Sequence, residues 1–227
     1  MRRMRNKEKA GQKASQKSGK EKEEEIAAVC WLLERHYGGL KPAVKLRTPF
    51  QTVVATALSA RTRDANTIKA ARQLFANYPT ANKLAKAPLK DVEKLVKPVG
   101  MYKTKARNIV ELAKRVEKTG VPNTLTGLVE LPGVGRKTAN CTLVYAFGIP
   151  AMCVDTHVHR ISNLLGWVKT KTPEQTERAL REIVPKSYWL GINDWLVKHG
   201  QRVCPANRPK CGECFLNTLC AYGKRVI

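Results

Sequence analysis

The chain has 227 residues, 43% of them hydrophobic, and its 42 Lys and Arg against 18 Asp and Glu give a formal net charge of +24. This is enough apolar material for one large or two modest cores, and the excess charge predicts a polyanionic partner, most simply nucleic acid; the alternative is a generally basic surface. The longest apolar run, residues 26–33, is too short to cross a membrane, and no apolar segment follows the basic N-terminus, so we expect a soluble intracellular protein.

Residues 1–24, at the start of the chain, are mostly charged or small polar residues. Such a segment buries too little apolar surface to stay ordered, so we predict a basic disordered tail, with helix where it runs into residues 23–25. Its charge either adds non-specific affinity for DNA or only keeps the protein soluble.

From residue 25 onward, hydrophobic residues recur at helical spacing. Thr48-Pro49 is typical of a helix cap followed by a first-turn proline, and Thr172 opens a capping box. Asp64 is expected to cap a further helix. No alternating stretch is long enough to predict a sheet, so the predicted fold class is all-α, with helices over residues 50–60, 64–75, 80–87, 89–96, 103–118, 173–184 and 189–200.

Residues 131–139 read Leu-Pro-Gly-Val-Gly-Arg-Lys-Thr-Ala. A proline and two glycines, Gly133 and Gly135, force a tight turn between two helices and let the backbone approach another surface closely. The amides at the start of the following helix then form a site for a phosphate oxygen. This is the helix-hairpin-helix signature, a clamp for the DNA backbone; the alternative is an ordinary turn between helices.

A lysine and an aspartate follow at positions suited to chemistry. Lys137 lies in the first turn of the second hairpin helix, where the helix dipole disfavours an ammonium and so favours a nucleophilic amine. Its alternative role is to bind a phosphate. Asp155 stands where an apolar stretch ends and a helix begins, so it is either a plain N-cap or a carboxylate that assists the lysine. His157 and His159 are expected to be structural or to contact phosphate.

Four cysteines close the chain as Cys204-x6-Cys211-x2-Cys214-x5-Cys220. Four thiolates within seventeen residues can surround one inorganic centre. Only one C-x2-C pair is present, which favours a [4Fe–4S] cluster over zinc, and disulfides are the third alternative. The other cysteines have apolar neighbours and are expected to be core residues in a reducing compartment: Cys30, Cys141 and Cys153.

With these motifs in place, the chain resembles the endonuclease III family of DNA glycosylases over roughly residues 25–223. The resemblance rests on the order and spacing of segments 58–64, 99–106, 131–140, 154–160 and 195–200 and of the four cysteines. It implies a six-helix barrel domain over residues 42–150, with the helix-hairpin-helix at about 125–147. Residues 25–41 and 151–227 would form an iron–sulfur domain, with the cleft for DNA and a flipped base between the two.

The resemblance also implies roles for particular residues. Lys137 would attack C1′ of the sugar and expel the base, with Asp155 as its catalytic partner, and the resulting iminium would lead to strand cleavage by β-elimination. Phosphate contacts are expected in the hairpin and beside the cysteine loop, and wedge or gap-filling roles at two further positions. The expected DNA-binding residues are Gly133, Val134, Gly135, Arg136, Arg61, Met101, Arg202, Arg208 and Lys210.

Two of these positions depart from the family pattern. Arg61 stands where glutamine is usual, and Met101 where leucine is common. An arginine can still fill a gap and bond an orphaned base, and methionine is a flexible apolar wedge. Neither change touches the catalytic pair, but both leave the lesion range open.

The predicted function is base excision repair by a bifunctional glycosylase that removes oxidised pyrimidines and nicks the abasic site. A glycosylase for thymine or uracil opposite guanine is the first alternative, against which Lys137 counts. A non-catalytic DNA-binding protein is the second. The expected partner is double-stranded DNA with damaged bases or abasic sites, bound by a monomer in the cytoplasm and nucleoid, or in a nucleus.

Overall fold

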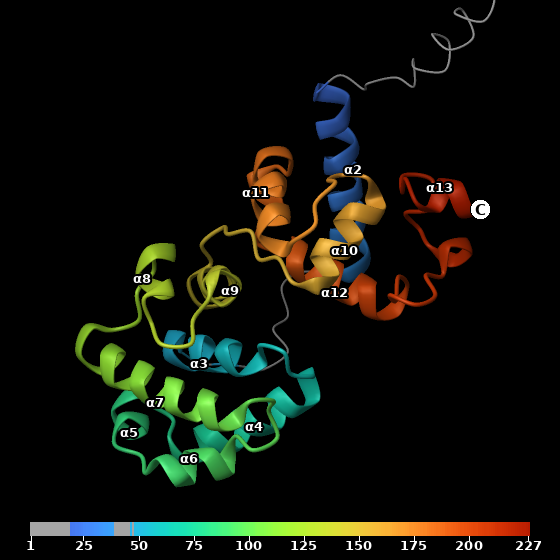
Figure 1. Ribbon diagram of the computed structural model, residues 1–227. Helices are drawn as coiled ribbons and strands as arrows, with labels where there is room; N and C mark the ends of the chain where they lie inside the picture. Colours follow the sequence, from blue (N-terminus) through green and yellow to red (C-terminus); the bar gives the residue numbers. More distant parts are fainter. Residues whose placement is uncertain (1–18, 39–45, 47) are drawn as a thin grey trace, which may run out of the picture.

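The computed structural model describes residues 19–38, 46 and 48–227. These residues form helices and no strand, so the all-α prediction is confirmed (Figure 1). None of the helices there has the length and apolarity needed to cross a membrane. The α-helices are α2 (Gly19–Tyr37), α3 (Pro49–Ser59), α4 (Asp64–Asn77), α5 (Ala81–Ala85), α6 (Leu89–Leu95), α7 (Tyr102–Thr119), α8 (Leu125–Val129), α9 (Arg136–Phe147), α10 (Thr156–Leu165), α11 (Pro173–Ile183), α12 (Ile192–Arg202) and α13 (Gly223–Val226), with 3₁₀ turns at Lys186–Tyr188 and Cys211–Glu213.

The first helix begins earlier than the sequence suggested. Helix α2 starts at Gly19, so helix extends through residues 19–24 of the predicted tail and not only next to residues 23–25, and residues 1–18 lie outside the described part of the chain. The reason is that Lys and Glu, although polar, are strong helix formers. The apolar side chains that follow, Ile26, Val29 and Leu33, anchor the helix in the core.

Two hydrophobic cores divide the structure. The first is built from α3–α9 and extends from Phe50 to Ala151. The second combines α2 with the chain from Met152 to Leu216. Figure 1 shows these two groups of helices as two lobes, with α9 next to the junction. The division of the chain into two domains remains our proposal, and the change of core between residues 151 and 152 supports it.

Local capping fixes several helix starts. Thr48 accepts a hydrogen bond from the Gln51 amide, and Thr172 accepts one from Gln175, as the sequence predicted. The prediction that Asp64 caps its helix is wrong. The cap position falls to Arg63, which makes no side-chain cap bond, and Asp64 is the first helical residue.

Candidate active site

A cavity of ≈ 370 Å³ opens between the two lobes. Its walls come from α3 and α4 on one side, from α9 in the middle, and from the start of α10 and from α12 on the other. The titratable residues that line it are Asp64, Lys137, Tyr145, Asp155, Asp194, Lys198 and Arg202. The structure therefore brings Lys137 and Asp155, eighteen residues apart in the chain, to one cavity.

The lysine of the hairpin motif is the second residue of α9, and Gly135 is the N-cap of that helix. The Lys137 side chain is half-buried and faces the cavity. Its amine has no hydrogen-bond or ion-pair partner within the described residues. Lys198, the other lysine in this cavity, is bound to Asp194 at 2.6 Å. Lys137 is therefore the lysine whose amine is available to a ligand.

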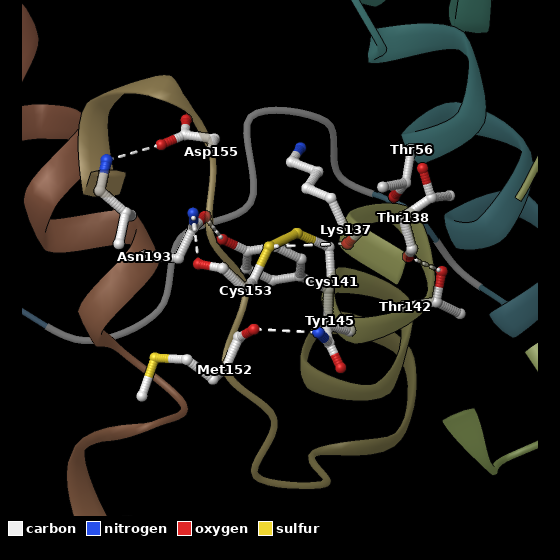
Figure 2. Close-up of a disulfide and its surroundings, with 12 residues drawn as sticks. Thr56, Lys137, Thr138, Cys141, Thr142, Tyr145, Met152, Cys153, Asp155 and Asn193 are labelled. Atoms are coloured by element: carbon white, nitrogen blue, oxygen red, sulfur yellow. Dashed lines mark hydrogen bonds between the residues drawn. A yellow bond between two sulfur atoms is a disulfide. The ribbon is translucent and has the colours of Figure 1, made fainter. Parts of the chain in front are cut away.

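Asp155 is the N-cap of α10, and its Oδ1 accepts a hydrogen bond from the Val158 amide at 2.8 Å. The other carboxylate oxygen accepts no hydrogen bond from the described part of the chain. One oxygen thus fixes the side chain while the second can act in the cavity. Figure 2 shows the Lys137 and Asp155 side chains on the same side of a disulfide that joins their two segments.

That disulfide links Cys141 on α9 to Cys153 in the segment before α10. Both cysteines are buried, as the sequence predicted for core residues, but their pairing was not predicted and does not fit the expected reducing compartment. One hydrogen bond reinforces the link, since Asn140 of α9 donates to the Met152 carbonyl. Asn193 of α12 holds the same segment from the other side by donating to the Cys153 carbonyl. The segment that carries Asp155 is therefore tied to the helix that carries Lys137.

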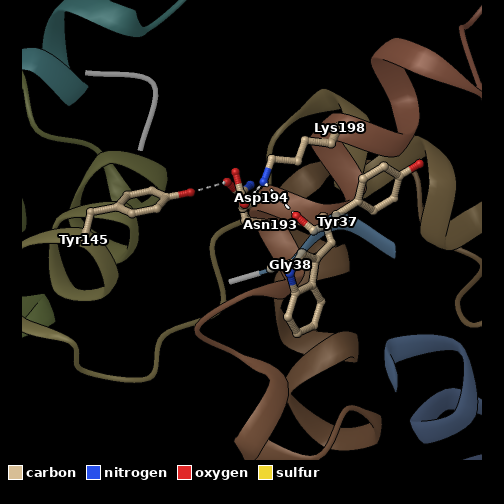
Figure 3. Close-up of polar contacts among 7 residues, drawn as sticks. Tyr37, Gly38, Tyr145, Asn193, Asp194 and Lys198 are labelled. Carbon is tan, nitrogen blue, oxygen red and sulfur yellow. Dashed lines mark hydrogen bonds and ion pairs between the residues drawn. The ribbon is translucent and has the colours of Figure 1, made fainter. Parts of the chain in front are cut away.

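Tyr145 and Asn193 bridge the lobes beneath the cavity. The Tyr145 hydroxyl donates to Asn193 Oδ1 at 3.2 Å, and Figure 3 shows this contact between α9 and α12 beside the Asp194–Lys198 pair. Burial raises the pKa of Tyr145, and the negative charges of Asp194 and Asp155 raise it further. Tyr145 therefore stays a neutral donor. Sequence reasoning missed both residues, since nothing local marks a contact across 48 positions.

The two hairpin glycines have different tasks. Gly133 has a positive φ of 75°, and a side chain there would meet Asn108 of α7 at 2.8 Å. The space for a side chain at Gly133 is therefore taken by Asn108, while Gly133 itself is exposed, and its contact with DNA stays a prediction. A side chain on Gly135 would meet nothing within 4 Å, so this residue faces open space. Val134 is buried and anchors the turn.

Arg136, which was expected to bind DNA, is occupied within the protein. Its Nε donates to Glu177 Oε2 at 3.1 Å, and its Nη2 donates to the second carboxylate oxygen. Glu177 is buried on α11, so this ion pair joins the hairpin to the other lobe. Nothing in the residues next to either partner marks a pair 41 positions apart.

The remaining residues expected to contact DNA are exposed and spread over three segments. Arg61 lies between α3 and α4, and Met101 is the N-cap of α7. Arg202 ends α12 and lines the cavity. Arg208 and Lys210 lie on the loop between the first two terminal cysteines.

The four terminal cysteines line a second cavity, together with apolar residues of α10 and of the C-terminal segment. No group of three or more His, Cys, Asp or Glu in the described chain is placed to hold a single metal ion. Burial raises the pKa of the Cys211 thiol, and the neighbouring charges of Cys204 and Cys220 raise it further. Four thiolates here would repel one another unless a cationic centre lay between them.

Polar groups already surround the sulfur atoms. Arg160 donates to Cys204 Sγ at 3.5 Å and to its carbonyl at 2.6 Å. The Gly223 amide donates to Cys220 Sγ at 3.4 Å. Such donors stabilise the thiolate form of a ligand. The chemistry of the donor set therefore fits a cluster bound by four cysteines.

The comparisons with known proteins define the class first. Residues 54–186 match the family model described as HhH-GPD superfamily base excision DNA repair protein. Endonuclease III of Thermotoga maritima is 52% identical over 180 residues, covering 78% of this chain and 84% of the relative. Endonuclease III of Escherichia coli K12 is 37% identical, covering 79% and 86%.

Solved structures agree with this class. A trapped endonuclease III–DNA covalent intermediate superposes with a TM-score of 0.83 at 34% identity, covering 89% of this chain and 97% of that one. A thermostable thymine-DNA glycosylase, with a TM-score of 0.77 at 24% identity, shares the fold. The chain belongs to the endonuclease III family. It is a base excision repair enzyme of the DNA glycosylase and abasic-site lyase class.

Proposed function

We propose that this protein removes oxidised pyrimidines from duplex DNA and then cleaves the abasic strand through a Schiff base on Lys137. The observation that carries this assignment is the Lys137 amine, which faces the interlobe cavity without a partner in the described chain, while Lys198 is held by Asp194. Removal of oxidised pyrimidines goes beyond what the comparisons establish and extends the likeness to the endonuclease III relatives.

The chemistry follows from these groups. A damaged base must leave the stack before a side chain reaches its sugar, at a cost of roughly a few kcal/mol. The neutral Lys137 amine attacks C1′, the bond to the base breaks, and the base leaves with its electron pair. Loss of the amine proton and opening of the sugar ring give an iminium. This acidifies the C2′ proton, and its removal expels the 3′ phosphate.

Asp155 supports both stages. With Oδ1 bound to the helix, its second oxygen can stabilise the positive charge that develops on the sugar and accept a proton from the lysine. Because the disulfide and the Asn140 hydrogen bond tie its segment to α9, this carboxylate is held in place before DNA binds.

Double-stranded DNA is the partner that the charge of +24 and the trapped DNA complex of the relative both indicate. We propose that Gly135, Arg202, Arg208 and Lys210 contact its phosphates. One chain supplies every element of the cavity, so we propose that the protein acts as a monomer. A DNA substrate implies that it acts where the cell keeps its DNA.

We further propose that the four terminal cysteines hold a [4Fe–4S] cluster. The sulfurs line a shared cavity, and their spacing, with a single C-x2-C pair, favours a cluster over one zinc ion. The cluster would supply a rigid cross-link for residues 204–220. It lies outside the cavity of Lys137, and it would orient the loop that carries Arg208 and Lys210.

Borohydride trapping tests the assignment. Wild type and Lys137→Ala are incubated with duplexes that carry thymine glycol, uracil opposite guanine, or an abasic site. We expect a covalent adduct on thymine glycol and on the abasic duplex that disappears in the variant, with Lys198→Ala as the control that still forms it. An adduct that forms only on the duplex with uracil opposite guanine would move the function to mismatch repair. No adduct on any duplex would remove Lys137 as the nucleophile.

A further inference from the structure

Two neighbouring turns each hold one residue in a strained backbone conformation. Among the described residues, Arg61 (φ 52°) and Met101 (φ 57°) are the only non-glycine residues with a left-handed backbone. L-residues adopt this conformation at a cost, and it persists only where the surrounding structure imposes it. Such residues concentrate at functional sites, so the contacts that impose this strain bear on function.

Both side chains are exposed to solvent, and Arg61 lies next to residues that line the active-site cavity. Met101 is 64% exposed, the most exposed large apolar side chain of the described residues apart from the C-terminal Ile227. Arg61 is exposed, and Ser59 and Asp64 on either side of it line the cavity. In the free protein, the exposed Met101 side chain buries little apolar surface that could offset its strained backbone. Such an apolar side chain is suited to insertion between stacked bases.

The two turns touch each other. A side chain built on Gly100 would lie 3.3 Å from the Arg61 carbonyl oxygen, so the backbone before Met101 runs against the Arg61 turn. Their separation is therefore set by the protein and is not left to the DNA.

One lysine binds both turns. Lys105 Nζ donates three hydrogen bonds: to the Leu58 carbonyl at 2.8 Å, to the Ala60 carbonyl at 2.6 Å, and to Thr62 Oγ1 at 2.9 Å. These use all three donors of an ammonium, and they surround Arg61 on both sides. The backbone amide of the same lysine donates to the Met101 carbonyl at 3.0 Å. Burial lowers the pKa of Lys105, as expected for an ammonium drawn away from water.

We infer that Lys105 is a positioning residue that fixes the spacing of Arg61 and Met101, so that the two side chains enter the DNA stack together when a base is extruded. This rests on the proposed function. The methionine would act as the apolar wedge, and the arginine would fill the gap and bond the orphaned base of the opposite strand. Without Lys105, the carbonyls of Leu58 and Ala60 lose their donor and the Arg61 turn is free to relax.

The test compares Lys105→Met, which keeps the side-chain length but removes the donors, with Lys105→Arg, which restores donors and charge. Lys103→Met is the matched control, because Lys103 is exposed two residues earlier. Each full-length protein is assayed for nicking of a thymine glycol duplex and of single-stranded abasic DNA, which needs no base extrusion. A duplex with 2-aminopurine opposite a tetrahydrofuran site reports entry into the stack by fluorescence.

For Lys105→Met, we expect kcat on the duplex to fall at least tenfold with little change in KM. The 2-aminopurine signal should be lost, nicking of single strands should stay within twofold of wild type, and Lys105→Arg should recover part of the signal. Wild-type fluorescence in Lys105→Met would overturn the inference, and so would an equal loss on both substrates. If wild type nicks neither substrate, the proposed function fails, and the fluorescence comparison still decides the role of Lys105.

Discussion

Cys141, one helical turn after Lys137, is joined by a disulfide to Cys153, two residues before Asp155. The bond therefore joins α9, which carries Lys137, to the segment that carries Asp155, and both side chains lie on the same side of it (Figure 2).

The first prediction concerns this bond. A disulfide that closes a loop of 12 residues should stabilise the fold by about 3 kcal/mol. Replacing both cysteines with serine should lower the free energy of unfolding in urea by about that amount, and a dithiol reductant should do the same to wild type. The double variant should not respond to reductant. Alkylation of both thiols in unreduced, denatured wild type would show that the bond is absent.

The second prediction separates the two roles of Asp155. Asparagine is as good an N-cap as aspartate but carries no charge, so Asp155→Asn should keep the stability of wild type and lose about a hundredfold in kcat. Asp155→Ala removes the cap as well and should also cost about 1 kcal/mol of stability. Single-turnover nicking and urea unfolding measure the two effects. Full activity in Asp155→Asn would reduce this residue to a cap.

Structural features that depend only on neighbouring residues, such as helix caps, could be predicted from the sequence. The helix starts at Thr48 and Thr172 depend on a hydroxyl and a proline next to it, and both are confirmed. The start of α12 was placed three residues early, at residue 189. The Trp189 indole donates instead to the Val184 carbonyl, and a 3₁₀ turn precedes the helix.

Contacts between distant segments could not be predicted. Lys137 and Asp155 were recognisable because each belongs to a short motif, whereas Tyr145 and Asn193 belong to none and meet only through the fold. Cys141 and Cys153 looked like core residues because their burial is visible in the sequence and their mutual orientation is not. The same limit applies to Glu177, whose partner lies in the other lobe.

The third prediction compares the Arg136–Glu177 ion pair with the phosphate contact proposed for Arg208. Arg136→Ala leaves the buried Glu177 carboxylate without its partner and should cost about 2 kcal/mol of stability, with the salt dependence of DNA binding unchanged. Arg208→Ala, on an exposed loop, should change DNA binding and leave stability unaffected. The slope of log K against log salt should fall by about 1, with stability unchanged. A reduced slope in Arg136→Ala would show that this arginine leaves Glu177 to bind DNA.

The last prediction concerns the terminal cysteines. Cys211→Ser removes one of four ligands, so the purified protein should lose the brown absorption of a [4Fe–4S] cluster and most of its iron. Residues 204–220 should then become sensitive to proteolysis, since the loop that carries Arg208 and Lys210 loses its anchor, and binding of undamaged duplex should weaken.

Cys30→Ala is the control for this change, because Cys30 is buried on α2 and lines neither cavity. It should keep its colour and its iron, so any loss of stability there reflects packing alone. The absorption spectrum and the metal content of wild type decide whether the four cysteines bind a [4Fe–4S] cluster or a zinc ion. A colourless wild type with one zinc ion per chain would contradict the cluster, because the four sulfurs would then have to converge on one ion.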